Sequence, residues 1–139
     1  MPNHVFVYGT LRTGDCRGSV LDPDKIVCGE AFIKGFTLHD LGSFPGILEG
    51  EGKVRGEMHE VDARTLETLD HIEGYRADKP SSSLYLRKAT DIFNSNDEVV
   101  GSAWVYVFNI GRRAAALRLP PLIESGDWFE HRGLYTRVV

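Results

Sequence analysis

The sequence lacks the features that would place it in several large classes of protein. It has no long apolar run, and residues 1–4 show neither the charged stretch nor the apolar core of a secretion signal. It has no cluster of basic residues, and its net charge is −4. We therefore expect a cytoplasmic protein with no membrane span and no nucleic-acid partner.

Cysteine is also scarce. The only two cysteines, Cys16 and Cys28, do not form a C-x-x-C spacing. In a reducing cytoplasm such thiols are usually free, which favours two free thiols over a disulfide between them. Neither is accompanied by a recognisable base motif, so structural thiols are a better interpretation than nucleophiles.

Motifs that hold nucleotides, metals or a serine nucleophile are missing as well. The sequence contains no G-x-x-x-x-G-K-[ST], no G-x-G-x-x-G and no G-x-S-x-G, which removes the usual indications of nucleoside triphosphatases, dinucleotide-binding enzymes and α/β-hydrolases. The histidines at 39, 59, 71 and 131 do not have the spacing of metal ligands. We expect neither a metal nor a cofactor.

What is present describes one ordinary domain. The chain has 139 residues, of which 42% are hydrophobic and 26% charged, and this is enough apolar material for a core. It has no repeat and no low-complexity tract, and its nearest approach to a linker, residues 79–83, is expected to be a surface loop. We predict a single domain over residues 1–139.

Most of the predicted elements are strands, because short β-branched and aromatic runs dominate the pattern. A strand pair is expected within 47–61, with its turn at Gly50 and Gly52, and residues 42–46 are expected to form another turn. Gly35 indicates a bulge or a close backbone approach. The remaining predicted strands cover 4–8, 31–38, 83–93 and 101–109.

The best helix prediction covers residues 63–73. Asp62 is a suitable N-cap, apolar residues recur every third position, and Gly74 is a natural stop. A second short helix is expected at 112–119, whereas residues 126–129 are too mixed to assign. Many strands with few helices and no regular alternation predict an α+β domain with a largely antiparallel or barrel-like sheet.

The first predicted strand runs directly into a loop with the sequence Tyr8-Gly9-Thr10-Leu11-Arg12. Glycine allows successive backbone N–H groups to turn outward and form a nest for a carboxylate or another small anion. Thr10 adds a hydroxyl group and Arg12 adds a cation. A simple tight turn, with Arg12 solvated, fits the same five residues.

Glu73 lies in the last turn of the predicted helix. The negative end of the helix dipole disfavours a carboxylate there, and hydrophobic cover from Ile72 and Tyr75 acts in the same direction, so we expect the pKa of Glu73 to be raised. A raised pKa would make Glu73 a better general base. The structural alternative is an exposed glutamate at a frayed helix end, or one paired with Arg76.

In their order and spacing, several segments resemble the γ-glutamylcyclotransferase-like superfamily, in particular its small γ-glutamylamine cyclotransferase-type proteins. The likeness covers nearly the whole chain. The segments that carry it are 8–12, 44–47, 54–61, 69–75, 85–87, 103–107 and 126–128.

The resemblance implies a small, mixed, largely antiparallel β-barrel with a few flanking helices and a cavity at one end. It implies that Glu73 is the catalytic residue and that backbone amides of the first loop bind the α-carboxylate of a glutamyl group, with Arg12 in support. Two tyrosines match positions that such proteins place near the pocket. The implied substrate-binding residues are Tyr8, Gly9, Thr10, Leu11, Arg12, Tyr85 and Tyr106.

The implied activity is that of a lyase or acyltransferase acting on a small γ-glutamyl molecule. A γ-glutamyl amine or γ-glutamyl amino acid would give 5-oxoproline and a free amine, through attack of its own α-amine with Glu73 as general acid/base. The leaving amine would be selected by the cavity rim, in the 77–84 segment and the C-terminal tail. Two alternatives stay open: a non-catalytic module that binds a carboxylate ligand, and a γ-glutamyl acyl or amine transferase.

Overall fold

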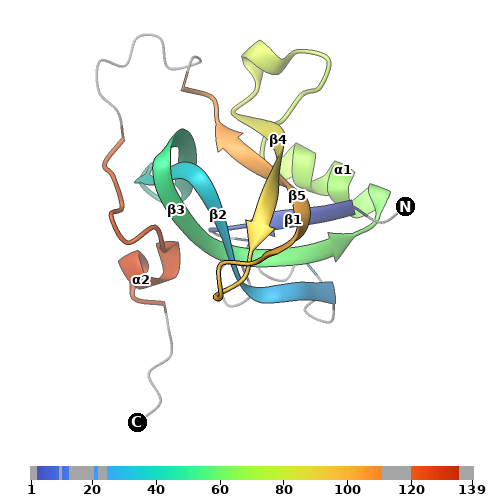
Figure 1. Ribbon diagram of the computed structural model, residues 1–139. Coiled ribbons are helices and arrows are strands. Elements are labelled where there is room, and N and C mark those ends of the chain that lie inside the picture. The colour runs from blue at the N-terminus through green and yellow to red at the C-terminus, as the bar shows by residue number, and fades with distance from the viewer. Residues whose placement is uncertain (1–2, 10, 13–20, 22–24, 111–119, 135–139) are drawn as a thin grey trace.

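The computed structural model describes residues 3–9, 11–12, 21, 25–110 and 120–134 (Figure 1). None of the helices in these ranges is long and apolar enough to cross a membrane. The elements are, in chain order, β1 (Asn3–Val7), β2 (Ile26–Asp40), β3 (Pro45–Val61), α1 (Ala63–Ile72), a 3-10 helix (Pro80–Ser82), β4 (Tyr85–Phe93), β5 (Val99–Phe108) and α2 (Trp128–Arg132).

The strands close into a barrel in the order β1-β3-β2-β4-β5. The pairing of β1 with β5 is parallel, and the other pairings are antiparallel. β2 and β3 form a long, curved hairpin that wraps around one side of the barrel, and α1 lies beside β1 (Figure 1). The predicted fold class, a small and largely antiparallel barrel with few helices, is confirmed.

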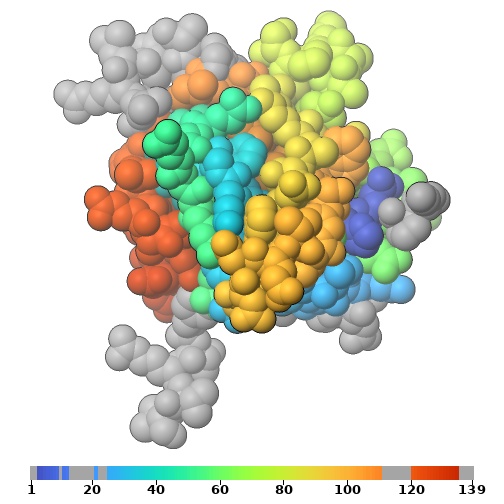
Figure 2. Space-filling view, in the orientation of Figure 1, coloured from blue at the N-terminus to red at the C-terminus, as the bar shows by residue number. Residues whose placement is uncertain are grey.

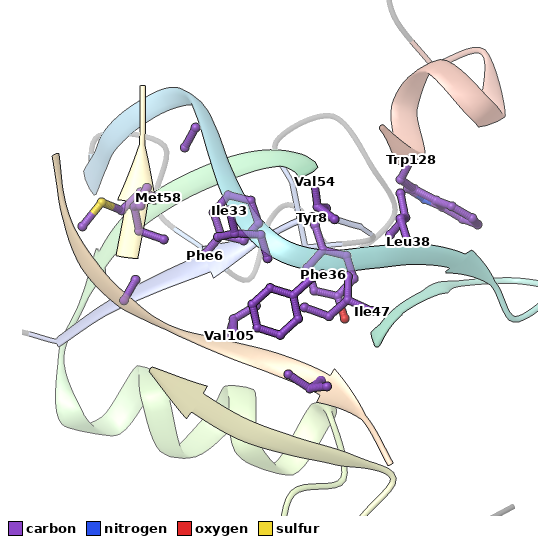
Figure 3. Packing of buried hydrophobic residues seen from close by; sticks show 14 of the residues in the cluster. Phe6, Tyr8, Ile33, Phe36, Leu38, Ile47, Val54, Met58, Val105 and Trp128 are labelled. Atoms are coloured by element: carbon purple, nitrogen blue, oxygen red, sulfur yellow. The ribbon is translucent and has the colours of Figure 1, made fainter. Parts of the chain in front are cut away.

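Two buried layers of side chains explain why the barrel forms. One fills its interior with apolar residues from all the strands, including Phe6, Ile33 and Met58 (Figure 3). The other lies outside the sheet, where Leu66 and Leu69 of α1 pack with the aromatic residues of β5. The run 103–108 therefore alternates between two covered faces, as expected for a strand buried on both sides.

α1 begins where its sequence predicts and ends one residue earlier than expected, at Ile72. The side chain of Asp62 accepts a hydrogen bond of 2.7 Å from the N–H of Thr65, which caps the first turn. Glu73 is the C-cap, and Gly74 follows with φ of 65°, a conformation that favours glycine.

The prediction of a strand pair within 47–61 is wrong. β3 is one continuous strand, and Gly50 and Gly52 lie inside it. A Cβ atom on Gly52 would lie 2.5 Å from the carbonyl oxygen of Phe36 on β2. The glycine thus permits a close approach of two backbones, which gives the same sequence pattern as a turn.

The bulge expected at Gly35 is confirmed, since the register of β2 with β3 shifts between Lys34 and Phe36 and Gly35 has φ of 84°. The turn expected near residues 42–46 is also present, although β3 already begins at Pro45.

The unassigned tail contains α2. Its N-cap, Asp127, accepts hydrogen bonds from the N–H groups of Phe129 and Glu130, and Gly133 ends the helix with φ of 65°. With only five residues, α2 is too short to show a helical period in the sequence. The helix expected at 112–119 falls outside the described residues.

Gly126 and Gly133 allow a matched test of how α2 is held. Both have left-handed backbone conformations, but a Cβ on Gly126 would collide with the carbonyl oxygen of Lys53, whereas a Cβ on Gly133 meets no described atom within 4 Å. We expect Gly133→Ala to lower the free energy of unfolding by about 1 kcal/mol, from backbone strain alone. Gly126→Ala should cost about 2 kcal/mol more. Urea unfolding of both variants measures the difference, and equal losses would contradict this account of the contact.

Candidate active site

The C-terminal ends of β1 and α1 meet because β3 pairs with β1 and leads directly into α1. β3 runs antiparallel to β1, so its last residue, Val61, pairs with Asn3 at the start of β1. α1 then returns along β1 (Figure 1). From the rise per residue, the ten residues of α1 span about 15 Å and the five of β1 about 16 Å. Glu73 and Tyr8 therefore arrive at the same end of the barrel.

A pocket lies between these two ends. It includes six of the residues predicted for the site, and the rest of its lining is mostly apolar. Its lining residues are Phe6, Val7, Tyr8, Gly9, Leu11, Phe44, Pro45, Ile72, Glu73, Leu84, Tyr85 and Tyr106. Thr10, also predicted, lies outside the described residues.

The loop after β1 is a tight turn. The N–H of Arg12 donates to the carbonyl oxygen of Gly9 at 3.0 Å, so this N–H is engaged within the turn. In the described part of the turn, the N–H groups of Gly9 and Leu11 are therefore the ones to consider for an anion. Gly9 lies against Pro45, and a Cβ atom on it would be 2.5 Å from the Cγ of that proline. Close packing requires glycine at this position.

The tyrosines of the pocket direct their hydroxyl protons into the protein. Tyr8 donates to the carbonyl oxygen of Tyr106 at 2.6 Å, and Tyr85 donates to that of Pro45 at 2.7 Å. Burial raises the pKa of Tyr8, and the neighbouring Tyr85 and Glu73 raise it further, against a backbone hydrogen bond with Ile47. Tyr8 therefore keeps its proton at neutral pH.

Tyr106 donates its proton to Asp70 of α1, at 2.7 Å from Oδ1. Burial raises the pKa of Tyr106, as do the hydrogen bond to Asp70 and the charges of Asp70 and Glu73, while Arg87 acts in the opposite direction. Tyr106 is thus also protonated at neutral pH.

Glu73 is half-buried and lies at the carbonyl end of α1, where its N–H donates to the carbonyl oxygen of Leu69 at 2.9 Å. Its charge acts on both Tyr8 and Tyr106. Glu73 therefore lines the pocket, while Arg76 forms an ion pair of 3.7 Å with Asp78. The raised pKa expected for Glu73 stays a prediction.

Arg12 lies behind the turn, outside the lining of the pocket, and is only 2% exposed. Its Nη1 donates to Oδ1 of Asp127 at 3.1 Å, its Nε lies 3.7 Å from Oε2 of Glu57, and its guanidinium stacks on Phe129. His59 in turn lies 3.0 Å from Oε1 of Glu57. The solvated Arg12 considered above is therefore wrong, and Arg12 supports the turn from within the protein.

Sequence reasoning missed the residues that hold the site from outside. Asp127 and Glu57 bind Arg12, and Asp70 binds both Tyr106 and Arg87. Asp70 lies in α1 three residues before its C-cap, Glu73, so the two side chains are on one face of the helix. This spacing could have indicated Asp70 from the sequence. The sequence gives no signal for Asp127 and Glu57 as partners of Arg12, because they lie on other elements and strand register is not visible in one sequence.

No three His, Cys, Asp or Glu side chains in the described ranges gather closely enough to bind a metal ion. The expectation that the reaction needs no metal and no cofactor stays a prediction.

Comparison with known proteins identifies the family. Residues 5–130 match the family described as γ-glutamyl cyclotransferase, AIG2-like. The chain is 32% identical to the γ-glutamylcyclotransferase family protein YtfP of Escherichia coli K12, over 91% of this chain and 96% of that protein. It is also 32% identical to γ-L-glutamyl-butirosin B γ-glutamyl cyclotransferase of Niallia circulans, over 78% of this chain and 68% of that protein.

Solved structures agree. The crystal structure of an AIG2-like protein from Mus musculus is 27% identical, with a TM-score of 0.62 over 99% of this chain and 97% of that one. The solution structure of ytfP from Escherichia coli is 29% identical, with a TM-score of 0.57 over 93% of this chain and 98% of that one. The chain belongs to the γ-glutamyl cyclotransferase, AIG2-like family, and the prediction of a γ-glutamylcyclotransferase-like enzyme is confirmed.

The buried ion pair behind the turn can be tested through two aspartates that cap helices. Asparagine caps a helix as well as aspartate does, so Asp62→Asn, at an exposed cap, should change stability little. Asp127→Asn removes the charge that faces buried Arg12, and we expect it to lower the free energy of unfolding by about 3 kcal/mol. Thermal and urea unfolding measure both. Similar, small losses at the two positions would show that the pair does not hold the turn.

Proposed function

We propose that the protein is a cyclotransferase that converts a γ-glutamyl amine or γ-glutamyl amino acid to 5-oxoproline and a free amine. One observation carries this proposal: Glu73 lines the same pocket as the turn after β1. A carboxylate and an anion-binding turn facing one another suit a substrate that has both a carboxylate and an amine. The α-carbon of a glutamyl group carries both.

Binding in this pocket would favour ring closure. With the α-carboxylate on the N–H groups of residues 9–11, the glutamyl side chain would extend between Glu73 and the tyrosines. The α-amine and the γ-carbonyl carbon belong to one molecule, so the pocket has only to hold them in the folded conformation. Alignment of this kind can lower the barrier by several kcal/mol, as effective molarities of intramolecular reactions show.

The proton transfers of this reaction need one acid/base group. Glu73 takes a proton from the α-ammonium group, and the freed nitrogen attacks the γ-carbonyl carbon. The new C–N bond closes the five-membered lactam, and Glu73 returns the proton to the nitrogen of the leaving amine as its bond to the carbonyl carbon breaks. Glu73 then carries a second proton from the ring nitrogen to the same amine, which departs as an ammonium ion and leaves one N–H on the lactam. Atoms and charge balance without water or a covalent enzyme intermediate.

The apolar lining would assist the reaction. Phe44, Ile72 and Leu84 surround Glu73 and the turn with side chains that cannot form hydrogen bonds. Exclusion of water strengthens the electrostatic interactions within the pocket. It would also keep water from competing with the α-amine of the substrate as the nucleophile.

The leaving amine would lie at the rim. Of the 77–84 segment, Leu84 lines the pocket, and the segment projects from the body of the molecule in Figure 2. The described part of the C-terminal tail, residues 120–134, adds nothing to the lining. The 77–84 segment would therefore contribute to the selection of the amine through Leu84. A cytoplasmic location stays a prediction.

Glu73→Gln tests the proposal, because it keeps the shape of the side chain and removes the proton acceptor. Incubation with a panel of γ-glutamyl amines and γ-glutamyl amino acids, followed by mass spectrometry, detects 5-oxoproline. We expect wild-type protein to release it and Glu73→Gln to be slower by a factor of about 100 to 10,000, with unchanged thermal unfolding.

Glu67→Gln is the matched control, since Glu67 is exposed on the same helix and should be replaceable without loss of activity. Full activity of Glu73→Gln would remove Glu73 from the mechanism. A γ-glutamyl product joined to a second amine would indicate a transferase, and binding without any product would indicate a non-catalytic module.

A further inference from the structure

The hydrogen-bond direction at Tyr106 is fixed by the groups behind it. Arg87 can only donate, and its Nη1 lies 2.7 Å from Oδ2 of Asp70. Asp70 is the carboxylate of this ion pair and can only accept. The hydroxyl group of Tyr106, 2.7 Å from Oδ1 of the same carboxylate, must therefore be the donor. Its oxygen lone pairs remain as acceptors.

The arrangement also holds Tyr106 in place. Arg87 is its direct partner across strands β4 and β5, and the guanidinium group of Arg87 lies 4.7 Å above the ring of Trp104. On the other side, the hydroxyl of Tyr8 donates to the carbonyl oxygen of Tyr106. The hydroxyl group and the carbonyl group of Tyr106 are thus both anchored, and the residue lines the same pocket as Glu73.

An acceptor oxygen next to a carboxylate suits a ligand group that donates hydrogen bonds and carries positive charge. The α-ammonium group of a glutamyl substrate has both properties, whereas its carboxylate and its γ-carbonyl oxygen have neither. The turn at the end of β1 would take the carboxylate, which leaves the amine for the opposite side of the pocket.

We propose that Asp70 and Arg87 are positioning residues that fix the hydroxyl oxygen of Tyr106 as an acceptor for the substrate's α-amine, beside Glu73. This inference rests on the proposed function and adds a specificity to it: the substrate needs a free α-amine for binding as well as for reaction. Tyr106 holds one N–H of the amine while Glu73 removes another proton, so the nitrogen lone pair is directed to the γ-carbonyl carbon. The lactam nitrogen of the product has one N–H and no charge, so this side of the product is held less tightly.

A pair of small probes tests this in the Glu73→Gln background, where turnover is suppressed. γ-L-Glutamylmethylamide carries the α-amine, and N-methylglutaramic acid is the same molecule without it. NMR titration gives the dissociation constant of each. We expect the amine to improve binding roughly ten- to a hundredfold, the range of a hydrogen bond to a charged group, and Tyr106→Phe to abolish this preference.

Arg87→Gln and Asp70→Asn change no residue that lines the pocket. They remove the constraint that makes the Tyr106 hydroxyl group a donor to residue 70, so each should reduce the preference for the probe with the α-amine severalfold. Lys88→Gln is the control, because Lys88 is adjacent to Arg87 on β4 and also forms an ion pair of 2.7 Å, with exposed Glu49. It should keep the full preference. If Tyr106→Phe fails to fold, a comparison of the amine preference of Arg87→Gln with that of Lys88→Gln still tests the inference, because neither residue lines the pocket.

The outcomes separate this inference from the proposed function. If the wild type releases 5-oxoproline but the preference survives both Tyr106→Phe and Arg87→Gln, the inference is overturned and the cyclotransferase stands. If the wild type releases none and neither probe binds, both fail. If the wild type releases none and the preference behaves as expected, the amine site stands and the cyclotransferase does not.

Discussion

The site depends on one geometric constraint, the matched lengths of β1 and α1. β3 ends beside the start of β1, and α1 then runs along β1. The two elements have nearly the same length. Packing of Leu66 and Leu69 against Val5 and Val7 fixes the two elements side by side. A helix one turn longer or shorter would move its C-cap by about 5.4 Å, away from the turn after β1.

Two arginines and their carboxylate partners stabilise the pocket from outside. Arg12, with Asp127 and Glu57, lies behind the turn, and Arg87, with Asp70, lies behind Tyr106. Neither arginine lines the pocket, so their charges serve to hold other groups in position. The pair of Arg12 and Asp127 also joins the cap of α2 to the turn, which gives the short C-terminal helix a structural connection to the site. Buried charges are costly unless they are paired, so losing a partner of buried Arg12 should be costly.

Much of this fold was predictable from local pattern. The first strand, the helix with its cap at Asp62, and the barrel-like class all follow from periodicity and turn residues. The glycines at 50 and 52 misled the prediction because glycine marks both turns and close backbone contacts, and only the partner strand distinguishes them. The short α2 gave too few residues for a period.

The site was predictable in part, for a physical reason. A helix-terminal Glu73 and a glycine turn after a strand are local features, and both lie in the pocket. The partners of Arg12 and Tyr106 depend on strand register and on packing between distant segments, such as the 115 residues that separate Arg12 from Asp127. Such contacts follow from the closed barrel and have no local signal.

The most direct test of the account is a crystal structure of Glu73→Gln protein soaked with γ-L-glutamylmethylamide. We expect the α-carboxylate on the N–H groups of residues 9–11, with the α-amine between residue 73 and the hydroxyl oxygen of Tyr106. A ligand bound elsewhere, or bound in this pocket with its carboxylate toward Tyr106 and its amine toward the turn, would contradict it.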